Sequence, residues 1–158
     1  VGYGTTVKPD KYDSVLLYGL EAGKYRLALK TPKDQIINVE YIRDKSKKKA
    51  AYKKSKAINL KSDIDSIYTS TEKAARWYKA SVSSTKKRKA VTLSKDSVGG
   101  GFKFCVYQKG KRLKTVKVTK NDKVKTVKLP KKKGTYYVKV TKLTSKTTGA
   151  YYLGTYTY

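Results

Sequence analysis

The residue types that usually carry out catalysis are scarce in this chain. It contains no histidine and a single cysteine, Cys105, which excludes Ser-His and Cys-His dyads and most zinc sites. Cys105 lies in an alternating segment typical of a strand, so we interpret it as structural. Asp63 and Asp65 could form a carboxylate pair, but retaining glycosidases hold such groups about 5 Å apart in a cleft, and a role in a turn fits them better. No motif singles out a Ser-Lys or Lys-Tyr dyad, and we expect no enzymatic activity.

The chemistry that the chain does offer is that of aromatic rings beside lysines on predicted strands. Successive side chains of a strand point to opposite faces, and the alternating valines near the C-terminal end predict that Tyr137 and Lys139 face outward. The same alternation places Trp77 and Lys79 on an outer face, with Tyr78 turned to the core. Further outward aromatics are predicted at Tyr107, beside the outward Lys103, and at Tyr156 or Tyr158.

Exposed aromatic rings flanked by lysines suit several ligands. Such rings stack on sugar rings, collagen prolines or nucleic-acid bases, while ammonium groups attract phosphate, sulfate or carboxylate. A simpler interpretation is that tyrosines cover a sheet because they suit a pleated, half-buried surface, and that the first 44 residues bury Trp77. The densest basic runs are Lys86–Lys89, Lys131–Lys133 and Lys45–Lys56.

The charge of the chain points to anionic partners. The 39 lysines and arginines stand against 11 acidic residues, a formal net charge of +28. Only five of the basic residues are arginines, whereas sequence-reading DNA-binding proteins use arginine to recognise guanine; no nucleic-acid recognition motif is present. Diffuse lysine charge suits teichoic acids, sulfated or uronic polysaccharides or anionic lipid surfaces. Solubility alone is the competing explanation. The predicted ligand-binding residues are Trp77, Lys79, Lys87, Arg88, Tyr107, Lys131, Lys132, Tyr137 and Lys139.

Period-2 alternation recurs along residues 57–158 and predicts around eight short strands. Gln108–Lys111 and Lys120–Lys123 have the composition of hairpin turns, and Gly99–Gly101 that of a looser bend. Ser70–Arg76 could form one helical turn at most. We predict an all-β fold, an antiparallel β-sandwich of jelly-roll-like form.

An internal repeat suggests how the chain is divided. Gly23–Leu29 matches Gly134–Val140, 111 positions further on, and the same offset carries Tyr41-Ile42 onto Tyr152-Leu153. We therefore expect residues 1–44 to be the closing strands of a preceding repeat, or a packed β extension, and residues 57–158 to be a complete sandwich. The basic stretch 45–56 between them has no apolar periodicity and is predicted to be a linker.

Several strings of residues indicate a family. Arg76–Val82, Phe104–Lys111, Leu129-Pro130, Gly134–Val140 and Gly149–Leu153, in that order and spacing, resemble the bacterial pre-peptidase C-terminal domain. That family of β-sandwiches is appended to secreted proteases and is similar to the collagen-binding domains of clostridial collagenases. The resemblance covers about residues 50–158, and residues 15–42 look like the end of a preceding copy.

The resemblance implies an extracellular accessory domain without catalysis of its own, which helps secretion or binds a surface polymer. The chain departs from the family pattern in two places, and the second concerns the calcium that the collagen-binding relatives hold. Arg76 stands where family members often carry Asp, and the acids Asp63, Asp65 and Glu72 are too sparse for the six to eight oxygen ligands of calcium. We expect no metal and no cofactor.

Our leading hypothesis is a non-catalytic bacterial module, secreted or on the cell surface. It would bind an anionic polysaccharide, cell-wall polymer or matrix protein through lysine charge and exposed aromatics. One alternative is a structural or spacer repeat of a larger surface protein with no specific ligand. Another is nonspecific nucleic-acid binding, which almost any chain with a charge of +28 would show at low salt. The apolar runs are too short for a membrane span, and no specific nucleic-acid partner is expected.

Overall fold

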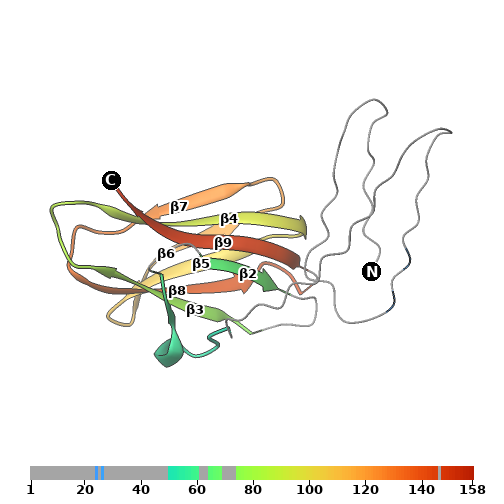
Figure 1. Ribbon diagram of the computed structural model, residues 1–158, viewed down its shortest axis with the longest axis horizontal. Helices are drawn as coiled ribbons and strands as arrows, with labels where there is room; N and C mark the ends of the chain where they lie inside the picture. The colour runs from blue at the N-terminus through green and yellow to red at the C-terminus, as the bar shows by residue number, and fades with distance from the viewer. Residues whose placement is uncertain (1–23, 25, 27–49, 61–63, 69–73, 146) are drawn as a thin grey trace.

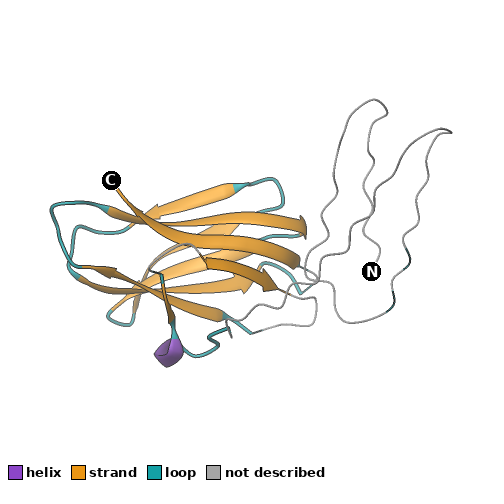
Figure 2. Cartoon of the chain, in the orientation of Figure 1, coloured by secondary structure: helices purple, strands orange, loops and turns teal. Residues whose placement is uncertain are grey.

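The computed structural model describes residues 24, 26, 50–60, 64–68, 74–145 and 147–158 (Figure 1). This part of the chain is built almost wholly of strands, with one short 3-10 helix (Figure 2). In chain order the elements are η1 (Lys54–Lys56), β1 (Ile58–Asn59), β2 (Ile64–Tyr68), β3 (Arg76–Val82), β4 (Lys89–Gly99), β5 (Phe102–Gln108), β6 (Lys111–Val118), β7 (Val124–Lys128), β8 (Gly134–Lys142) and β9 (Thr148–Thr157). The predicted all-β class is confirmed.

The strands form two sheets that face each other as the layers of a sandwich (Figure 1). One sheet has five strands in the order β1-β3-β8-β5-β6, and the other has four in the order β2-β9-β4-β7. The strand pairs are antiparallel, apart from the short parallel pair of β1 with β3. Most neighbouring strands are not consecutive in the chain, β5 and β6 being the exception. The antiparallel sandwich predicted from the sequence is confirmed.

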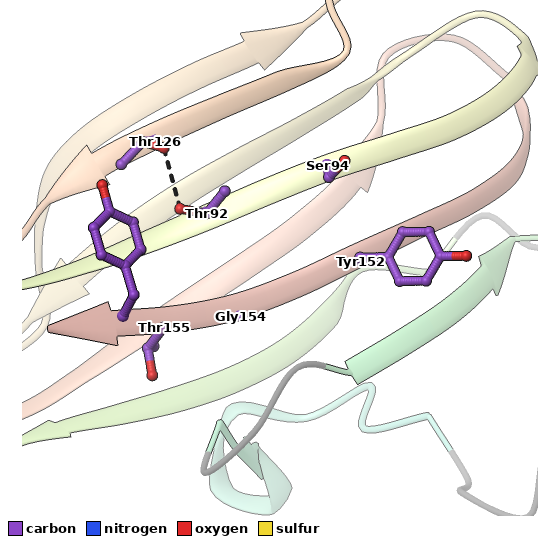
Figure 3. Close-up of a pocket in the computed structure, with 7 residues that line it drawn as sticks. Thr92, Ser94, Thr126, Tyr152, Gly154 and Thr155 are labelled. Carbon is purple, nitrogen blue, oxygen red and sulfur yellow. Dashed lines mark hydrogen bonds between the residues drawn. The ribbon is translucent and has the colours of Figure 1, made fainter.

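The outer face of the four-stranded sheet carries hydroxyl and aromatic side chains (Figure 3). Thr92 on β4 and Thr126 on β7 are register partners, and their hydroxyl oxygens lie 3.1 Å apart. Tyr152 and Tyr156 on β9 are exposed beside them. The predicted outward position of Tyr156, and that of Tyr158 beyond the strand, is confirmed.

Alternation of side chains between core and solvent explains the strands of the five-stranded sheet. In β3, Tyr78, Ala80 and Val82 are buried, whereas Trp77 and Lys79 between them are only partly covered. In β8 the same pattern buries every second residue from Tyr136 to Val140. The strand parity predicted from the sequence is confirmed for both strands.

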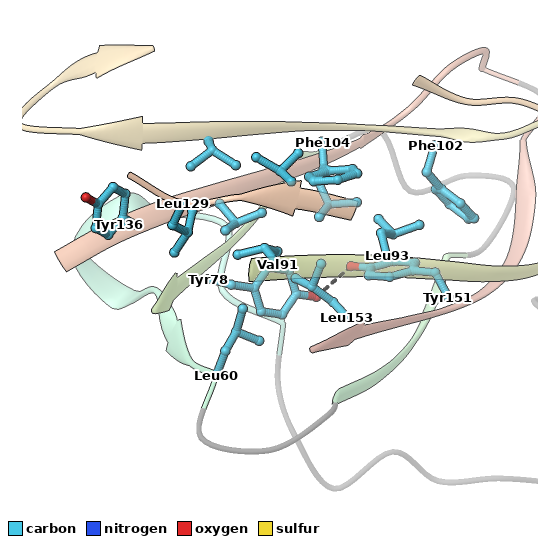
Figure 4. Close-up of a cluster of buried hydrophobic side chains, with 14 of the residues drawn as sticks. Leu60, Tyr78, Val91, Leu93, Phe102, Phe104, Leu129, Tyr136, Tyr151 and Leu153 are labelled. Carbon is cyan, nitrogen blue, oxygen red and sulfur yellow. Dashed lines mark hydrogen bonds between the residues drawn. The ribbon is translucent and has the colours of Figure 1, made fainter. Parts of the chain in front are cut away.

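The core lies between the two sheets and takes side chains from both (Figure 4). Tyr78 of the five-stranded sheet and Tyr151 of the four-stranded sheet share a hydrogen bond between their buried hydroxyl groups, which is drawn in Figure 4. The Tyr151 ring also packs against Phe102, with centroids 5.0 Å apart. Burying one large apolar side chain contributes about 1.5–3 kcal/mol, so this contact layer joins the sheets into one unit.

The turn between β5 and β6 is a tight hairpin, as predicted. Its two central residues, Lys109 and Gly110, have φ angles of 48° and 80°. Positive φ at both central positions defines the turn type whose twist matches that of paired antiparallel strands.

The sequence predicted a second hairpin at Lys120–Lys123, and this prediction is wrong, because the two strands that the turn joins do not pair with each other. The residues do form a turn, but it carries the chain from β6 in one sheet to β7 in the other. Asp122 closes the turn by accepting hydrogen bonds from the Thr119 amide at 2.9 Å and the Thr119 hydroxyl at 2.7 Å. Pairing β7 with β4 buries Val127 in the shared core, and this burial outweighs the local preference for a hairpin.

The predicted bend at Gly99–Gly101 is confirmed, and it too joins the sheets, from β4 to β5. Gly100 has a φ of +80°, and a Cβ atom on Gly101 would lie 2.1 Å from the carbonyl oxygen of Val118. The bend therefore needs glycine for its backbone angle at one position and for space at the next.

One local prediction near the start of the sandwich is wrong. Asp65 lies in β2, paired with Tyr152 of β9, and not in a turn; Asp63 lies outside the described residues. Arg76 begins β3 opposite Val140 and belongs to no helical turn. Long-range pairing with β9 overrides the local signal at Asp65. Residues 70–73 of the predicted helical turn lie outside the described residues.

Residues 50–56, within the predicted linker, lie against the edge of the five-stranded sheet. Ala51 is buried, and its carbonyl oxygen accepts a hydrogen bond of 2.7 Å from the Trp77 amide. The division into 1–44, 45–56 and 57–158 stays a prediction, because the first segment, apart from Lys24 and Arg26, lies outside the described residues.

Candidate functional site

Five of the predicted ligand-binding residues share the outer face of the five-stranded sheet. Trp77 is the register partner of Lys139, and Lys79 is the partner of Tyr137. Tyr137 in turn lies opposite Tyr107 on β5. We call this set, Trp77, Lys79, Tyr107, Tyr137 and Lys139, the aromatic–lysine patch. The sheet brings together residues that lie up to 62 positions apart in the sequence.

Three side chains of the patch, those of Trp77, Tyr107 and Lys139, are in contact. The Trp77 and Tyr107 rings have centroids 5.7 Å apart and are tilted by 43°. The Lys139 ammonium nitrogen lies 5.6 Å from the Trp77 ring centroid, within the range of a cation–π interaction. All five residues are partly buried, so the rings are held in place and still reach the surface.

Lys54 of η1 also borders the patch, which the sequence did not indicate. Its ammonium nitrogen lies 4.7 Å from the centroid of the Tyr137 ring. The position of η1 follows from the Ala51–Trp77 backbone hydrogen bond, which attaches this segment to the edge of β3. The only signal in the sequence was the basic composition of residues 45–56, which does not distinguish Lys54 from the lysines around it.

The electrostatic character of this face is uniformly positive. None of the five strands of this sheet contains Asp or Glu, while Arg112 of β6 is the register partner of Tyr107 and Lys103 lies further along β5. Burial raises the pKa of the Tyr107 phenol, Cys105 raises it further, and Arg112 opposes the shift. Tyr107 is therefore a neutral hydroxyl at physiological pH and can donate a hydrogen bond to an anionic oxygen.

The other four predicted residues lie together at one end of the sandwich. Lys87 and Arg88 are in the β3–β4 loop, and Lys131 and Lys132 are in the β7–β8 loop. The pairing of Val82 with Gly134 brings the two loops next to each other, and all four side chains are exposed. We call the set of Lys87, Arg88, Lys131 and Lys132 the basic end. The exposed Lys109 of the β5–β6 turn lies at the same end and was not singled out from the sequence.

The patch and the basic end adjoin. Tyr137 is three residues from Gly134, where β8 meets the β7–β8 loop, a distance of about 10 Å along the strand. We call the patch together with the adjoining basic end the strip. Its rings lie in the patch, and its exposed cations lie at one end, where the Arg88 backbone exchanges hydrogen bonds with that of Tyr158. A strip of this kind can hold an extended anionic chain by stacking and by charge.

Other kinds of site find little support in the described part of the chain. Within it no three His, Cys, Asp or Glu residues come together as a metal site would require. Cys105 is 6% exposed in β5, with its sulfur 3.4 Å from the Thr115 hydroxyl oxygen. No helix in this part is long and apolar enough to cross a membrane.

Fold and surface together define a β-sandwich that displays an aromatic and cationic surface on one sheet. No model of a known protein family matches the chain, and no curated protein matches it. Among solved structures it is similar to the pre-peptidase C-terminal domain of collagenase from Bacillus anthracis, with 17% identity, 63% of this chain and 92% of the other covered, and a TM-score of 0.48. It is also similar to a family 35 carbohydrate binding module from an environmental isolate, with 17% identity, 57% and 75% covered, and a TM-score of 0.38.

Proposed function

We propose that this chain is a non-catalytic bacterial module, secreted or on the cell surface, that binds an anionic polymer along the strip of patch and basic end. The observation that carries the proposal is the contact of Trp77, Tyr107 and Lys139 on a sheet whose strands contain no acidic residue. The ligand class is an anionic polysaccharide, a cell-wall polymer such as teichoic acid, or a matrix protein.

The two parts of the strip have different roles in this proposal. Lysines of the basic end attract the polymer over a distance set by the Debye length, which is about 10 Å at 0.1 M salt and about 3 Å at 1 M. The rings of Trp77, Tyr107 and Tyr137 pack against the apolar faces of the polymer, a contact that salt does not screen. The basic end therefore governs salt-dependent attraction, and the patch governs what remains at high salt.

A spacer repeat without a ligand is the second candidate, and one observation favours it. The rings of the patch already take part in contacts within the chain, since Lys54 lies over the Tyr137 ring and Lys139 over the Trp77 ring. If these contacts are the purpose of the rings, replacing Trp77 or Tyr137 by alanine lowers the stability and leaves polymer binding unchanged.

Binding of the full 158-residue chain to heparin, polygalacturonate, teichoic acid, purified cell walls and collagen tests the proposal, with duplex DNA as a polyanion control. Titrations at 0.1 M and 0.5 M NaCl separate the contribution of charge to the affinity from that of ring stacking. We expect at least one ligand to bind at the higher salt and DNA to be released. If every ligand is released in parallel with DNA, the lysines are a nonspecific coat and the spacer candidate is favoured.

Two matched double variants test which lysines contribute to polymer binding. Lys131→Glu with Lys132→Glu changes the basic end, whereas Lys120→Glu with Lys123→Glu makes the same change of charge at the opposite end of the sandwich, in the β6–β7 turn. We expect the first pair to weaken binding at 0.1 M NaCl at least tenfold and the second no more than threefold. Equal effects of the two pairs would show that net charge alone governs binding.

A further inference from the structure

The four-stranded sheet carries a second surface of different chemistry. A shallow groove of about 360 Å³ lies on its outer face (Figure 3). The groove is lined by Thr92, Ser94, Thr126, Tyr152, Gly154, Thr155 and Tyr156. Its volume is within the range of sites that hold small ligands. This face points away from the aromatic–lysine patch, because the core separates the two sheets.

The lining of the groove has no charged side chain. The chain has 39 lysines and arginines among its 158 residues, and yet the seven lining residues offer only hydroxyl groups, two phenol rings and a glycine. A site for an anionic ligand would be expected to include lysine or arginine side chains, because lysine is the commonest residue of this chain. The lining therefore suits a neutral ligand.

Two tyrosines frame the groove, with an open floor between them. Tyr152, Gly154 and Tyr156 alternate along β9 and so share its outer face. Tyr152 is 43% exposed and Tyr156 is 46% exposed, and their Cα atoms are about 13 Å apart at the rise of an extended strand. Gly154 has no side chain, so the space between the two rings stays free for a ligand.

Hydroxyl groups line the side of the groove opposite β9. Thr92 is the register partner of both Gly154 and Thr126, and Ser94 is the partner of Tyr152. In the Thr92–Thr126 hydrogen bond one hydroxyl donates and the other accepts, so one hydroxyl proton and several lone pairs of the pair remain for a ligand. The Ser94 hydroxyl donates to the Lys123 carbonyl oxygen at 3.4 Å and keeps its acceptor capacity.

From these features we infer that the groove binds a neutral polysaccharide chain. The C–H faces of pyranose rings are apolar and pack flat on phenol rings such as those of Tyr152 and Tyr156. The equatorial hydroxyl groups of the sugar exchange hydrogen bonds with Thr92, Thr126 and Ser94. This site goes beyond the anionic-polymer function proposed above, since it lies on the other sheet and takes a ligand of different charge.

Isothermal titration calorimetry of the full chain at 0.5 M NaCl tests this inference. The probes are hydroxyethylcellulose, laminarin, galactomannan, amylose and dextran, all of them neutral. We expect at least one to bind, and we expect Tyr152→Ala and Tyr156→Ala each to raise its Kd at least tenfold. Thr92→Val, which keeps the shape and removes the hydroxyl, should raise the Kd about threefold or more. If no probe binds, or if both tyrosine variants bind as tightly as the parent chain, the inference is overturned.

Controls separate the two surfaces. Trp77→Ala removes a ring of the aromatic–lysine patch and should leave the neutral-polysaccharide Kd within twofold of the parent value. Conversely, Tyr152→Ala and Tyr156→Ala should leave heparin binding at 0.1 M NaCl within twofold. If only the variants of the patch lose heparin binding, this result bears on the proposed function and leaves the inference about the groove unaffected. Both tyrosines are exposed, so thermal unfolding of their variants should differ little from the parent chain.

Discussion

The rings of Trp77 and Tyr107 meet above β8, the strand that lies between their own strands. β3 and β5 each pair with β8, so their backbones are about 10 Å apart at the usual strand spacing. The ring centroids are nevertheless only 5.7 Å apart, which means that both side chains lean inward over Lys139 and Tyr137. A ligand at this point of the sheet would contact side chains of three strands at once.

The Trp77–Tyr107 contact makes the tryptophan a reporter of the patch. The chain has a single tryptophan, so its fluorescence arises from this site alone. We expect Tyr107→Ala to shift the emission maximum to longer wavelength, because Trp77 becomes more exposed, and to weaken heparin binding at 0.5 M NaCl about tenfold, which corresponds to about 1.4 kcal/mol.

Tyr107→Phe is the matched control for this prediction. It keeps the ring and removes only the hydroxyl, so the emission maximum and most of the affinity should be retained. Binding by Tyr107→Ala that equals that of the parent chain would argue against a role of the ring in ligand contact.

The hydrogen bond between Tyr78 and Tyr151 joins the two sheets in the core. Tyr78→Phe and Tyr151→Phe should each lower the free energy of unfolding by about 1–2 kcal/mol, because each leaves a buried hydroxyl without this partner. The double variant should lose less than the sum of the two, with a coupling energy of about 1 kcal/mol. Urea denaturation of the four chains measures this cycle, and strictly additive losses would mean that the two hydroxyls do not act as a pair.

Gly101 allows the close crossing between the sheets. Gly101→Ala should lower the free energy of unfolding by about 2–3 kcal/mol, since its Cβ atom would lie 2.1 Å from the Val118 carbonyl oxygen and would force the backbone to shift. Gly110→Ala is the comparison, because there φ is +80° but no atom lies within 4 Å of the added Cβ. It should cost about 1 kcal/mol. Thermal and urea denaturation of both variants measure these losses. A larger loss of stability for Gly110→Ala than for Gly101→Ala would contradict the steric argument.

Asp122 should make a pH-dependent contribution to the turn between β6 and β7. Its hydrogen bond with Lys125, at 2.7 Å, and those with Thr119 hold the pKa of the carboxyl well below its usual range. An unfolded Asp has a pKa of about 3.9, so the contribution is fully present above that pH and is lost as the pH falls toward the folded-state value.

The difference in stability between the parent chain and Asp122→Asn should therefore be constant from pH 7 to pH 5 and shrink below pH 4. Denaturant titrations at pH 7, 5, 4 and 3 measure it. A difference that stays constant down to pH 3 would show that the ionised carboxylate is not what stabilises the turn. Lys120→Gln in the same turn, which leaves the Asp122 contacts in place, is the control.

Local sequence patterns predicted much of the fold because they express local physics. The alternation of Tyr78, Ala80 and Val82 indicated a half-buried strand, and the alternation around Val138 did the same for β8. Lys109-Gly110 indicated the hairpin turn because glycine readily takes positive φ. At Asp65 and at Lys120–Lys123 the local signal was misleading, since the choice of neighbour was made by burial in a core that spans both sheets.

The sequence by itself determined the all-β class, the strong positive charge and the outward direction of Trp77, Tyr107 and Tyr137, because composition and strand parity depend only on neighbouring residues. The tertiary structure alone decided that Trp77 contacts Tyr107, that the two basic loops share one end, and that Thr92, Thr126 and Tyr152 line one groove. These relationships depend on strand order and register. Both are set by the joint burial of distant residues such as Tyr78 and Tyr151, which no local pattern encodes.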